Sequence, residues 1–411
     1  MVSANDSNVA PRSGRIILSI DLGSSSLKLA VHRVGSDCEL CLLEGGIEAF
    51  GTSNAALWIR DDRYPPRAVT RRLLGPRTPV AVLLAFLEEL DVAVDAIGHR
   101  LVYGGPAHEA PARITSELLT SLAGLVSFDP LHLTDALTAI REFEKALPDV
   151  PQVVCFDTAF HRRMPMVAQR LPLPRELWAE GVRRYGFHGL SYESIVRQLG
   201  DAGTRGRMIV AHLGNGASVA AMRDGSPVDT TMGFSPLGGV MMGTRPGDLD
   251  PGVLLYLLRE GRYTLRELED VLTRQSGLLG VSGNSADMQL LLQRRASDSA
   301  AAEAVELFVY FARKHIGALA ATLGGLDTLV FTGGIGMNAA PVRWEIAEGL
   351  AFLGLKLDPA CNVAGAPIVS ADGSRVVVRV METNENLMVA RHTWATLFQA
   401  AASKVDDPAH A

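Results

Sequence analysis

The chain contains few cysteines, and they are scattered as Cys38, Cys41, Cys155 and Cys361 along its 411 residues. Cys38 and Cys41 have C-x-x-C spacing, but no second pair or histidine cluster accompanies them. We therefore interpret them as strand residues rather than as a metal or redox site. Reduced thiols of this kind indicate a cytoplasmic location.

The sequence also lacks a long hydrophobic run that is free of charge. Its most apolar long segment, Ala301–Leu323, contains five ionisable side chains. Such a segment is predicted to be a buried helix of a globular protein and not a bilayer span. Residues 1–14 are polar and lack the apolar region of a signal peptide, so they predict a disordered tail.

There is no excess of positive charge. The net charge of −6 argues against nucleic-acid binding, which requires a basic face. Hydrophobic residues make up 47% of the chain and charged residues 20%, which is typical of a globular protein. The length suits two domains, and the absence of low-complexity linkers predicts that they pack together with a cleft between them.

What the chain does contain is a repeated glycine hairpin. Residues 15–31 predict a strand, a polar turn at 21–26 that includes Gly23, and a returning strand. Residues 207–222 repeat this pattern around Gly214. The repeat predicts a duplicated α/β domain with backbone N–H groups available at each glycine turn. Two unrelated hairpins are the alternative.

A third glycine-rich segment, 332–338, follows a β-branched strand and predicts a loop, with a helix from about Pro341. Helix boundaries are clear elsewhere. Asp250 is expected to begin one helix, Thr264 begins another with a capping box, and Gly324 ends the long apolar helix.

Phosphoryl transfer requires a metal held by carboxylates and donors around the phosphates. Ser24, Ser26 and Lys28 follow Asp21 on the first glycine turn, where they are suited to bind a phosphate while Asp21 holds Mg²⁺ through water. A serine-rich turn with a capping aspartate is the structural alternative. Glu385 is predicted either to share this metal or to begin the last helix favourably.

Arg100 and Arg245 both lie at glycine turns, where a guanidinium is suited to bind a carboxylate or a phosphoryl oxygen. Surface salt bridges are the alternative for both. His132 and His188 have apolar or glycine neighbours and are candidates for catalysis or for structural hydrogen bonds. Asp157 ends a strand, which makes it a site candidate or a helix N-cap.

Taken together, these segments resemble the acetate kinase family, which belongs to the superfamily of sugar kinases, Hsp70 and actin. The resemblance extends from Ile17 to about Arg391. The motifs that carry it, in family order, are Gly98-His-Arg100, Phe156-Asp-Thr-Ala-Phe-His161, Tyr185-Gly-Phe-His-Gly189, His212-Leu-Gly-Asn-Gly-Ala-Ser218, Met242-Gly-Thr-Arg245, Ser276-Gly-Leu-Leu-Gly-Val-Ser282 and Thr383-Asn-Glu385.

The resemblance implies two duplicated actin-like (ribonuclease H-like) α/β domains with an interdomain active-site cleft. Their expected bounds are 15–157 with 388–411 for the first domain and 158–387 for the second. It implies reversible transfer of the γ-phosphoryl group of ATP to acetate by a homodimer, with ATP/ADP and Mg²⁺ or Mn²⁺ as cofactors. No nucleic-acid or membrane partner is expected.

The resemblance also implies roles for individual residues. The implied catalytic residues are Arg100, His132, Asp157, His188 and Arg245, with metal held by Asp21 and Glu385. The implied pocket for the acetate methyl consists of Val102, Leu131, Phe187 and Pro236 beside Arg100. The implied nucleotide-binding residues are Ser24, Ser26, Lys28, His212, Gly214, Asn215, Gly216, Asp287, Met288, Gly333, Gly334, Ile335, Gly336 and Asn338.

The sequence departs from the family pattern at several positions. Asp21 replaces an asparagine, Tyr103 a histidine, Leu133-Thr134 an Asn-Pro pair, Gly238 a glutamate, Gln289 an arginine and Met337 a glutamate. These departures bear on the choice of acceptor and nucleotide, so propionate or another short acid is an alternative acceptor.

Three other functions fit part of the pattern. Gly334-x-Gly336-x-x-Ala339 with Asp358 matches a dinucleotide-binding fingerprint, but a dehydrogenase leaves the duplicated hairpins without a role. A sugar or glycerol kinase leaves Arg100 and Arg245 unexplained, because a neutral acceptor needs no carboxylate clamp. An inactive nucleotide-binding relative predicts ATP binding without turnover.

Overall fold

A computed structural model describes residues 14–23, 26–50, 52, 55–61, 67–72, 78–126, 128 and 133–399. Most of the predicted tail, together with Ser24, Leu131 and His132, lies outside the described residues. The chain divides into two compact units. The first contains the residues up to Ala159 and those from Glu385 onward, and the second is Phe160–Asn384.

The described residues of the first unit form an eight-stranded mixed sheet in the order β5-β4-β3-β2-β1-β6-β8-β7. Its strands are β1 (Arg15–Leu22), β2 (Ser26–Val34), β3 (Glu39–Glu48), β4 (Ala56–Asp61), β5 (Arg67–Arg72), β6 (Ala96–Leu101), β7 (Ala112–Arg113) and β8 (Gln152–Phe156). Its helical segments are α1 (Pro79–Glu89), α2 (Ser116–Ala123), α3 (Leu133–Ala146), α15 (Glu385–Trp394) and the π-helical turn η3 (Ala395–Gln399). The 3-10 turn η1 (Ala159–Arg163) follows β8.

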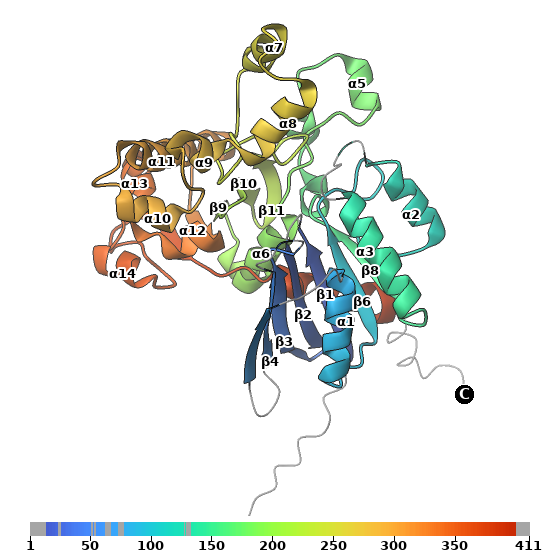
Figure 1. Cartoon of the computed structure of the whole chain (residues 1–411). Helices are drawn as coiled ribbons and strands as arrows, with labels where there is room; N and C mark the ends of the chain where they lie inside the picture. Colours follow the sequence, from blue (N-terminus) through green and yellow to red (C-terminus); the bar gives the residue numbers. More distant parts are fainter. Residues whose placement is uncertain are drawn as a thin grey trace, which may run out of the picture. The chain divides into compact units, whose positions relative to one another are not determined.

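Side-chain alternation along β1 gives this sheet two buried faces. Leu18 and Ile20 pack with Leu83 of α1 and Phe143 of α3 on one face. Ile17 packs with Ala390 of α15 on the opposite face. Helix α15, from the C-terminal part of the chain, therefore covers the sheet of the first unit, behind β1 and β6 in Figure 1.

The described residues of the second unit form a five-stranded sheet in the order β11-β10-β9-β12-β13. Its strands are β9 (Arg207–Leu213), β10 (Ala217–Arg223), β11 (Ser226–Thr230), β12 (Thr328–Thr332) and β13 (Val377–Val380). Its helical segments are α4 (Met166–Gln169), α5 (Arg175–Ala179), α6 (Gly189–Gly203), α7 (Pro251–Arg259), α8 (Leu265–Arg274), α9 (Gly277–Ser282), α10 (Met288–Arg294), α11 (Ser299–Leu323), α12 (Gly333–Asn338), α13 (Ala340–Glu348), η2 (Ala351–Leu353) and α14 (Pro359–Ala364).

The two sheets share one topology. In each sheet, the first strand pairs antiparallel with the next strand of its hairpin, β1 with β2 and β9 with β10. The same first strand pairs parallel with a later strand, β1 with β6 and β9 with β12. A further parallel strand follows in both, β8 in the first unit and β13 in the second. The predicted duplicated α/β fold is confirmed.

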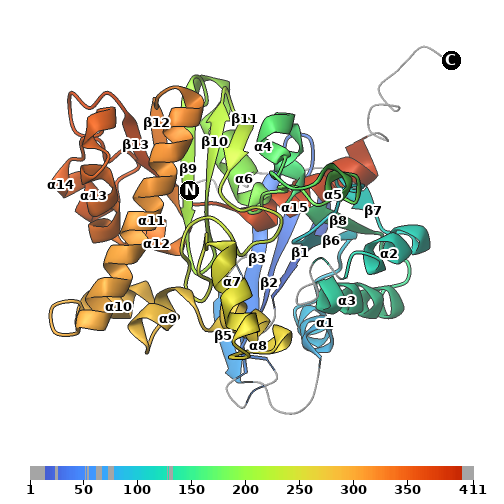
Figure 2. The same ribbon diagram turned by 90° about the horizontal axis from the view of Figure 1, so that it is seen from above.

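Helices cover both faces of the second sheet, as Figure 2 shows for α6 and α11. Tyr192 and Ile195 of α6 pack on Met208, Val210 and neighbouring residues of the sheet. The buried residues of α11 recur every three or four positions and contact β9, β10 and β11 from the other face. This spacing is that of one helical stripe, so the predicted buried helix is confirmed.

The predicted helix boundaries hold at three positions. Asp250 caps α7, Thr264 forms a capping box with Glu267, and Gly324 ends α11 in the left-handed conformation. The prediction of a loop at 332–338 is wrong, because Gly333–Asn338 forms the short helix α12. Its glycines give little intrinsic preference for a helix, so the neighbouring structure must hold it.

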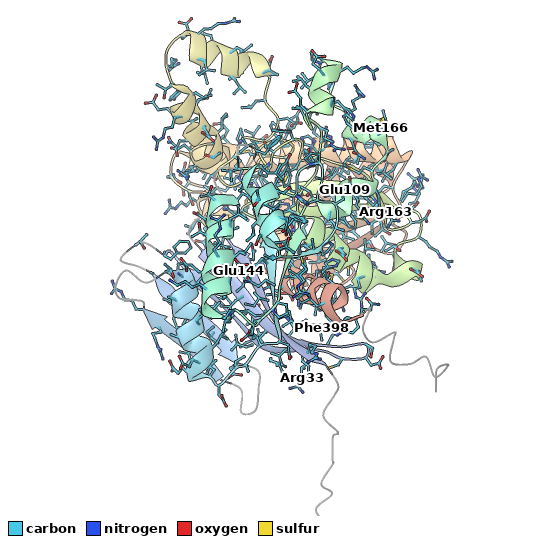
Figure 3. The ribbon with its side chains drawn as sticks, turned by 90° about the vertical axis from the view of Figure 1, so that its right-hand side faces the viewer. Arg33, Glu109, Glu144, Arg163, Met166 and Phe398 are labelled. Carbon is cyan, nitrogen blue, oxygen red and sulfur yellow. The ribbon has the colours of Figure 1, made fainter. Side chains whose placement is uncertain are left out.

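Other predictions concern the chain as a whole. Within the described ranges, no helix is long and apolar enough to cross a membrane. None of the four cysteines, all of which are described, forms a disulfide. The C-terminal segment stays with the first unit, where the Arg15 guanidinium lies 5.0 Å from the ring centroid of Phe398, which is labelled in Figure 3.

One buried histidine makes the first unit sensitive to acid. His99 of β6 is enclosed beside Gln152, with Nε2 2.6 Å from the amide oxygen, and burial lowers its pKa to about 4. The unfolded chain therefore binds a proton there below about pH 6.5 that the folded chain does not. This contribution to stability is present above pH 6.5 and is lost as the pH falls toward 4.

We predict that His99→Gln reduces the acid sensitivity of the protein. Between pH 7.5 and pH 5.0 the wild-type free energy of unfolding should fall by about 2 kcal/mol more than that of the variant. Urea unfolding at the two pH values measures this difference. An equal fall in both proteins would contradict the prediction.

Candidate active site

Three parallel strands of the first unit place charged side chains at their carboxyl ends. Asp21 lies near the end of β1 and Arg100 near the end of β6, where the two are register partners. The Arg100 Nη1 atom donates to Asp21 Oδ1 at 2.7 Å. The predicted metal carboxylate and the predicted substrate arginine therefore form an ion pair with each other.

Two further carboxylates surround the same guanidinium. Asp157, directly after β8, is fully buried and accepts a hydrogen bond from Arg100 Nη2. Glu385, the first residue of α15, lies with Oε2 3.5 Å from Arg100 Nε. Arg100, Asp21, Asp157 and Glu385 together are called the arginine–carboxylate cluster below, and all four belong to the first unit.

The cluster contains more negative than positive charge. Burial lowers the pKa of Arg100, but the charges of Asp157, Asp21 and Glu385 outweigh this effect and raise it well above its usual value. The pKa of Glu385 is raised to about 7, chiefly by burial. The charge of Arg100 lowers this pKa, whereas the charges of Asp157 and Asp21 raise it further. One guanidinium thus compensates only part of the charge of three carboxyl groups.

This imbalance fits a divalent cation. Asp157 Oδ1 is buried and accepts no hydrogen bond from the described residues, so one acceptor is left for a ligand. Mg²⁺ commonly binds to one or two protein carboxylates and completes its shell with water and phosphate oxygens. In the part of the chain that the structure describes, no group of three or more histidine, cysteine, aspartate or glutamate residues converges as a ready-made metal site.

The other described residues of the first glycine turn flank this cluster, and the charge of Lys28 acts to lower the pKa of Glu385. Lys28 is exposed on β2 as the register partner of Asp21, and Ser26 begins the same strand. The Ser26 carbonyl accepts from Gly23 N at 2.8 Å, which closes the turn. Their predicted contact with phosphate stays a prediction, as does that of Ser24, which lies outside the described residues.

In the second unit, a strained turn presents His188. The backbone of His188 has φ of 56° and lies directly before α6. Gly186 has φ of 73°, and a Cβ atom there would lie 2.6 Å from the ring of the buried His161, so only glycine fits. The His161 Nε2 atom lies 2.9 Å from the Phe187 carbonyl, and this hydrogen bond helps to fix the turn.

A second histidine stacks on the first. The ring centroids of His188 and His212 are 4.3 Å apart, with the planes 20° from parallel. Both Nε2 atoms face the glycine turn 214–216, because a Cβ atom on Gly216 would lie 3.3 Å from His188 Nε2 and one on Gly214 would lie 3.7 Å from His212 Nε2. The stacked histidines thus border the turn that was predicted to bind phosphate.

Arg245 reaches the same turn from a different segment. Its Nη1 atom would lie 3.8 Å from a Cβ atom on Gly216 and donates to the Pro236 carbonyl at 3.1 Å. The loop that carries Arg245 is fixed by α9, since the N–H groups of Leu278 and Leu279 donate to the carbonyls of Met242 and Gly243 at 2.9 Å. The Ser276–Ser282 motif therefore positions Arg245.

A cavity of about 940 Å³ lies beside this turn in the second unit. It is lined by Gly214, Asn215, Ala286, Asp287, Met288, Gln289, Leu292, Gln293, Gly334, Ile335, Asn338 and Ala339. Half of the residues predicted to bind the nucleotide thus line one cavity, namely Gly214, Asn215, Asp287, Met288, Gly334, Ile335 and Asn338. The Asp287 carboxylate accepts from Gln289 N at 2.8 Å as the cap of α10.

Comparison with known proteins decides the family. A model of the acetokinase family matches residues 16–391. The chain belongs to the acetokinase family. It is 45% identical over 395 residues to the acetate kinase of Rhodopseudomonas palustris, covering 92% of this chain and 98% of that protein.

Two solved structures of the family have the same fold. One is a propionate kinase from Francisella tularensis, with a TM-score of 0.87 and 34% identity. The other is the acetate kinase of Porphyromonas gingivalis, with a TM-score of 0.82 and 33% identity. Each comparison covers 93% of this chain and 100% of the other. The family and the actin-like fold predicted from the sequence are confirmed.

The residues implied for the acetate methyl occur in both units of this acetokinase. Val102 is half-buried in the first unit. In the second, Phe187 is buried and Pro236 is half-buried next to Arg245. Leu131 and the predicted catalytic His132 lie outside the described residues. The methyl pocket stays a prediction.

The departures from the family pattern have different surroundings. Asp21 pairs with Arg100, and Gln289 lines the nucleotide cavity. Tyr103 is buried and stacks on Phe128. Gly238 lies beside Asp248, and the Met337 carbonyl accepts a hydrogen bond from Arg343.

Arg343 is a residue that the sequence analysis missed. It is only 1% exposed, and it donates to the carbonyls of Gly336 and Met337 and to the side chain and carbonyl of Asn362. The first two carbonyls end α12, so Arg343 stabilises this glycine-rich helix against the cavity. Burial lowers the pKa of Arg343. The partners of its guanidinium in these hydrogen bonds are all neutral groups. An arginine inside an ordinary helix gives no sequence signal for this role.

We predict that Arg343→Lys weakens nucleotide binding, because lysine cannot form the planar fork that reaches these carbonyls. The Kd for ATP should rise about 10-fold, equivalent to about 1.4 kcal/mol, as measured by calorimetry. Arg313→Lys is the matched control, since Arg313 bonds to the Glu345 carbonyl of α13 away from α12. Equal losses in both variants, or none in Arg343→Lys, would contradict the prediction.

Proposed function

We propose that this acetokinase transfers the γ-phosphoryl group of ATP to acetate and forms acetyl phosphate and ADP in a reversible reaction. An acetate carboxylate oxygen attacks the γ-phosphorus directly, and the bond from phosphorus to the bridging oxygen of ADP breaks. No residue of the chain forms a covalent phosphoryl intermediate in this proposal.

The observation that carries the proposal is the set of donors at the 214–216 turn. His188 Nε2, Arg245 Nη1 and the backbone of the turn border one position. Charge develops on the phosphoryl oxygens during transfer, and fixed donors and cations stabilise that charge without having to reorganise. Such an arrangement is suited to the equatorial oxygens of a phosphoryl group in flight.

The cavity beside this turn supports the nucleotide part of the proposal. Its glycine turns, with Gly214 and Gly334 adjacent, allow backbone N–H groups to approach the phosphates closely. Met288, Leu292 and Ile335 supply apolar surface for a base. The amides of Gln289, Gln293 and Asn338 both donate and accept hydrogen bonds, as a base edge requires.

We assign the acceptor carboxylate to Arg100, whose fork suits two carboxylate oxygens. In the structure its Nη atoms donate to Asp21 and Asp157, so the acceptor must take the place of one of these partners. If the acceptor carboxylate replaces one of the two aspartates, the buried guanidinium of Arg100 has carboxylate partners before and after the acceptor binds. The cost of an unpaired buried charge is thereby avoided.

The proposal includes Mg²⁺, with Asp21 and Glu385 as the residues that would hold it. When bound, the metal would neutralise phosphate charge during transfer. The excess negative charge of the arginine–carboxylate cluster supports a cation there. Asp157, with its unused oxygen, would orient the acceptor or a water next to the metal.

Propionate is the second candidate acceptor, and the similarity to the propionate kinase of Francisella tularensis favours it. One additional methylene changes binding in an apolar pocket by only about 1 kcal/mol. The two acids should therefore both react, and the assay below determines which of them is preferred.

We predict acceptor-dependent ADP formation from Mg-ATP with acetate and propionate, a slower reaction with butyrate, and none with glycerol. In Arg245→Gln, kcat with acetate should fall about 100-fold or more, because a fixed donor to the transferring group is removed. A coupled assay of ADP measures both. Arg223→Gln is the matched control, as Arg223 of the same unit bonds the Leu323 carbonyl on the protein surface.

Other outcomes would reassign the protein. Turnover with glycerol alone would move it to the sugar kinases. ATP binding without any acceptor effect would mean an inactive relative. Equal activity of Arg245→Gln and Arg223→Gln would remove Arg245 from the proposed mechanism.

We also propose that the enzyme is a cytoplasmic homodimer. The cytosol keeps thiols reduced, consistent with cysteines that form no disulfide. The support for a dimer is α7, which has no buried residue although Val253, Leu255, Tyr256 and Leu258 are apolar and exposed. Contiguous exposed apolar residues commonly mark a protein interface.

We predict that the wild-type chain sediments at twice its mass of 43.9 kDa and that Leu255→Glu sediments as a monomer. A charge at the centre of a buried apolar interface costs several kcal/mol. Sedimentation velocity distinguishes the species. A monomeric wild type, or a dimeric Leu255→Glu variant, would show that α7 is not the interface.

A further inference from the structure

A buried chain of hydroxyl groups leads to the ring of His188 in the second unit. Ser218 of β10 is fully buried, and its Oγ lies 2.8 Å from His188 Nδ1. On its other side the Tyr192 hydroxyl lies 2.5 Å from the same Oγ. Tyr192 is also fully buried and belongs to the first turn of α6, four residues after His188.

The direction of these hydrogen bonds follows from acidity. A serine hydroxyl has one proton to donate and lone pairs to accept with. A tyrosine phenol is a stronger acid than a serine alcohol and is therefore the better donor. In the favoured arrangement Tyr192 donates to Ser218, and Ser218 donates to Nδ1 of His188.

An Nδ1 atom that accepts a hydrogen bond carries no proton, so the proton of the neutral imidazole is on Nε2. The Nε2 atom is the one that faces the turn at Gly216, beside Arg245. The ring then offers an N–H donor to an anion at this turn. The reverse arrangement, with Nδ1–H donating to Ser218, would present a lone pair to the anion and repel it.

We propose that Tyr192 and Ser218 are positioning residues that hold His188 in the Nε2–H tautomer, so that it donates to an oxygen of the transferring phosphoryl group. The inference rests on the proposed function for the identity of that anion. The tautomer itself is inferred from the contacts of Ser218 and does not require the identity of that anion. Neither hydroxyl touches the substrate, and both act through the histidine ring.

The first test is spectroscopic and needs no substrate. Ring ¹⁵N chemical shifts of histidine-labelled protein distinguish the two neutral tautomers and the cation, and a His188→Gln spectrum assigns the signal. We expect the Nε2–H tautomer in the wild type. Ser218→Ala should lose this preference and show a mixture. The Nδ1–H tautomer in the wild type would overturn the proposal, and so would an unchanged signal in Ser218→Ala.

The second test separates catalysis from binding. In Ser218→Ala the kcat with acetate should fall about 10- to 100-fold, less than the loss expected when a donor to the developing charge is removed outright. The KM values for ATP and acetate should stay within about twofold, because the lost interaction acts mainly in the transition state. Tyr192→Phe removes a single oxygen atom and should lower kcat about 3- to 10-fold.

Thr204→Val is the control for losing a buried hydroxyl, since Thr204 directly follows α6 and its Oγ1 donates to the Gly200 carbonyl at 3.0 Å. Its kcat and its His188 signal should match the wild type. Equal losses in Thr204→Val and Ser218→Ala would overturn the proposal. If Ser218→Ala does not fold, Tyr192→Phe decides, and an unchanged kcat in that variant would overturn it too.

The proposed function and the positioning role of the two hydroxyls can be refuted separately. A wild type without acetate-dependent turnover would refute the proposed function, whereas the ¹⁵N spectrum would still report the tautomer. A fully active wild type whose His188 tautomer is unchanged in Ser218→Ala and Tyr192→Phe would refute the positioning role alone.

Discussion

The buried charge of Arg100 constrains the whole first unit. An arginine removed from water without partners would cost several kcal/mol, and removing one partner of a buried pair is strongly destabilising. Its compensating carboxylates come from the end of β1, the residue after β8 and the start of α15. The parallel register of β1, β6 and β8 and the return of the chain's last helix to this unit are therefore all needed to keep one cation compensated.

The second unit has the same topology, but the strand ends that carry carboxylates in the first unit carry hydrogen-bond donors here. At the carboxyl ends of β9 and β12 it has glycine turns, stacked histidines and the nearby Arg245, where the first unit has carboxylates. Open α/β sheets commonly bind ligands at the carboxyl ends of their strands. Duplication thus supplied two similar edges, and the residue types at each edge determine whether it suits a cation and a carboxylate or a phosphate.

Sequence reasoning succeeded where a signal is local. The hairpins around Gly23 and Gly214 and the helix boundaries at Asp250, Thr264 and Gly324 depend on residues a few positions apart. It failed at α12, because its glycines predict a loop and the carbonyls that end it are held by the side chain of Arg343 from the following helix. It also could not show that Asp21 pairs with Arg100, since that contact depends on the register of two strands 79 residues apart.

The stacked histidines show why a motif can be recognised while its supporting contacts cannot. Ser218 and His212 are register partners in the hairpin, yet Ser218 bonds His188, which precedes α6. Ser191 belongs to α6, and its Oγ lies 2.8 Å from Nδ1 of His212 in β9. Each serine thus holds the histidine of the other element, and both rings are fixed only when α6 docks on the β9–β10 hairpin. Because two separate hydrogen bonds then direct two Nε2 atoms to one glycine turn, a small shift of α6 would disturb both rings together. The packing of Tyr192 and Ile195 in the core is therefore part of the donor geometry and not only of the stability of the fold.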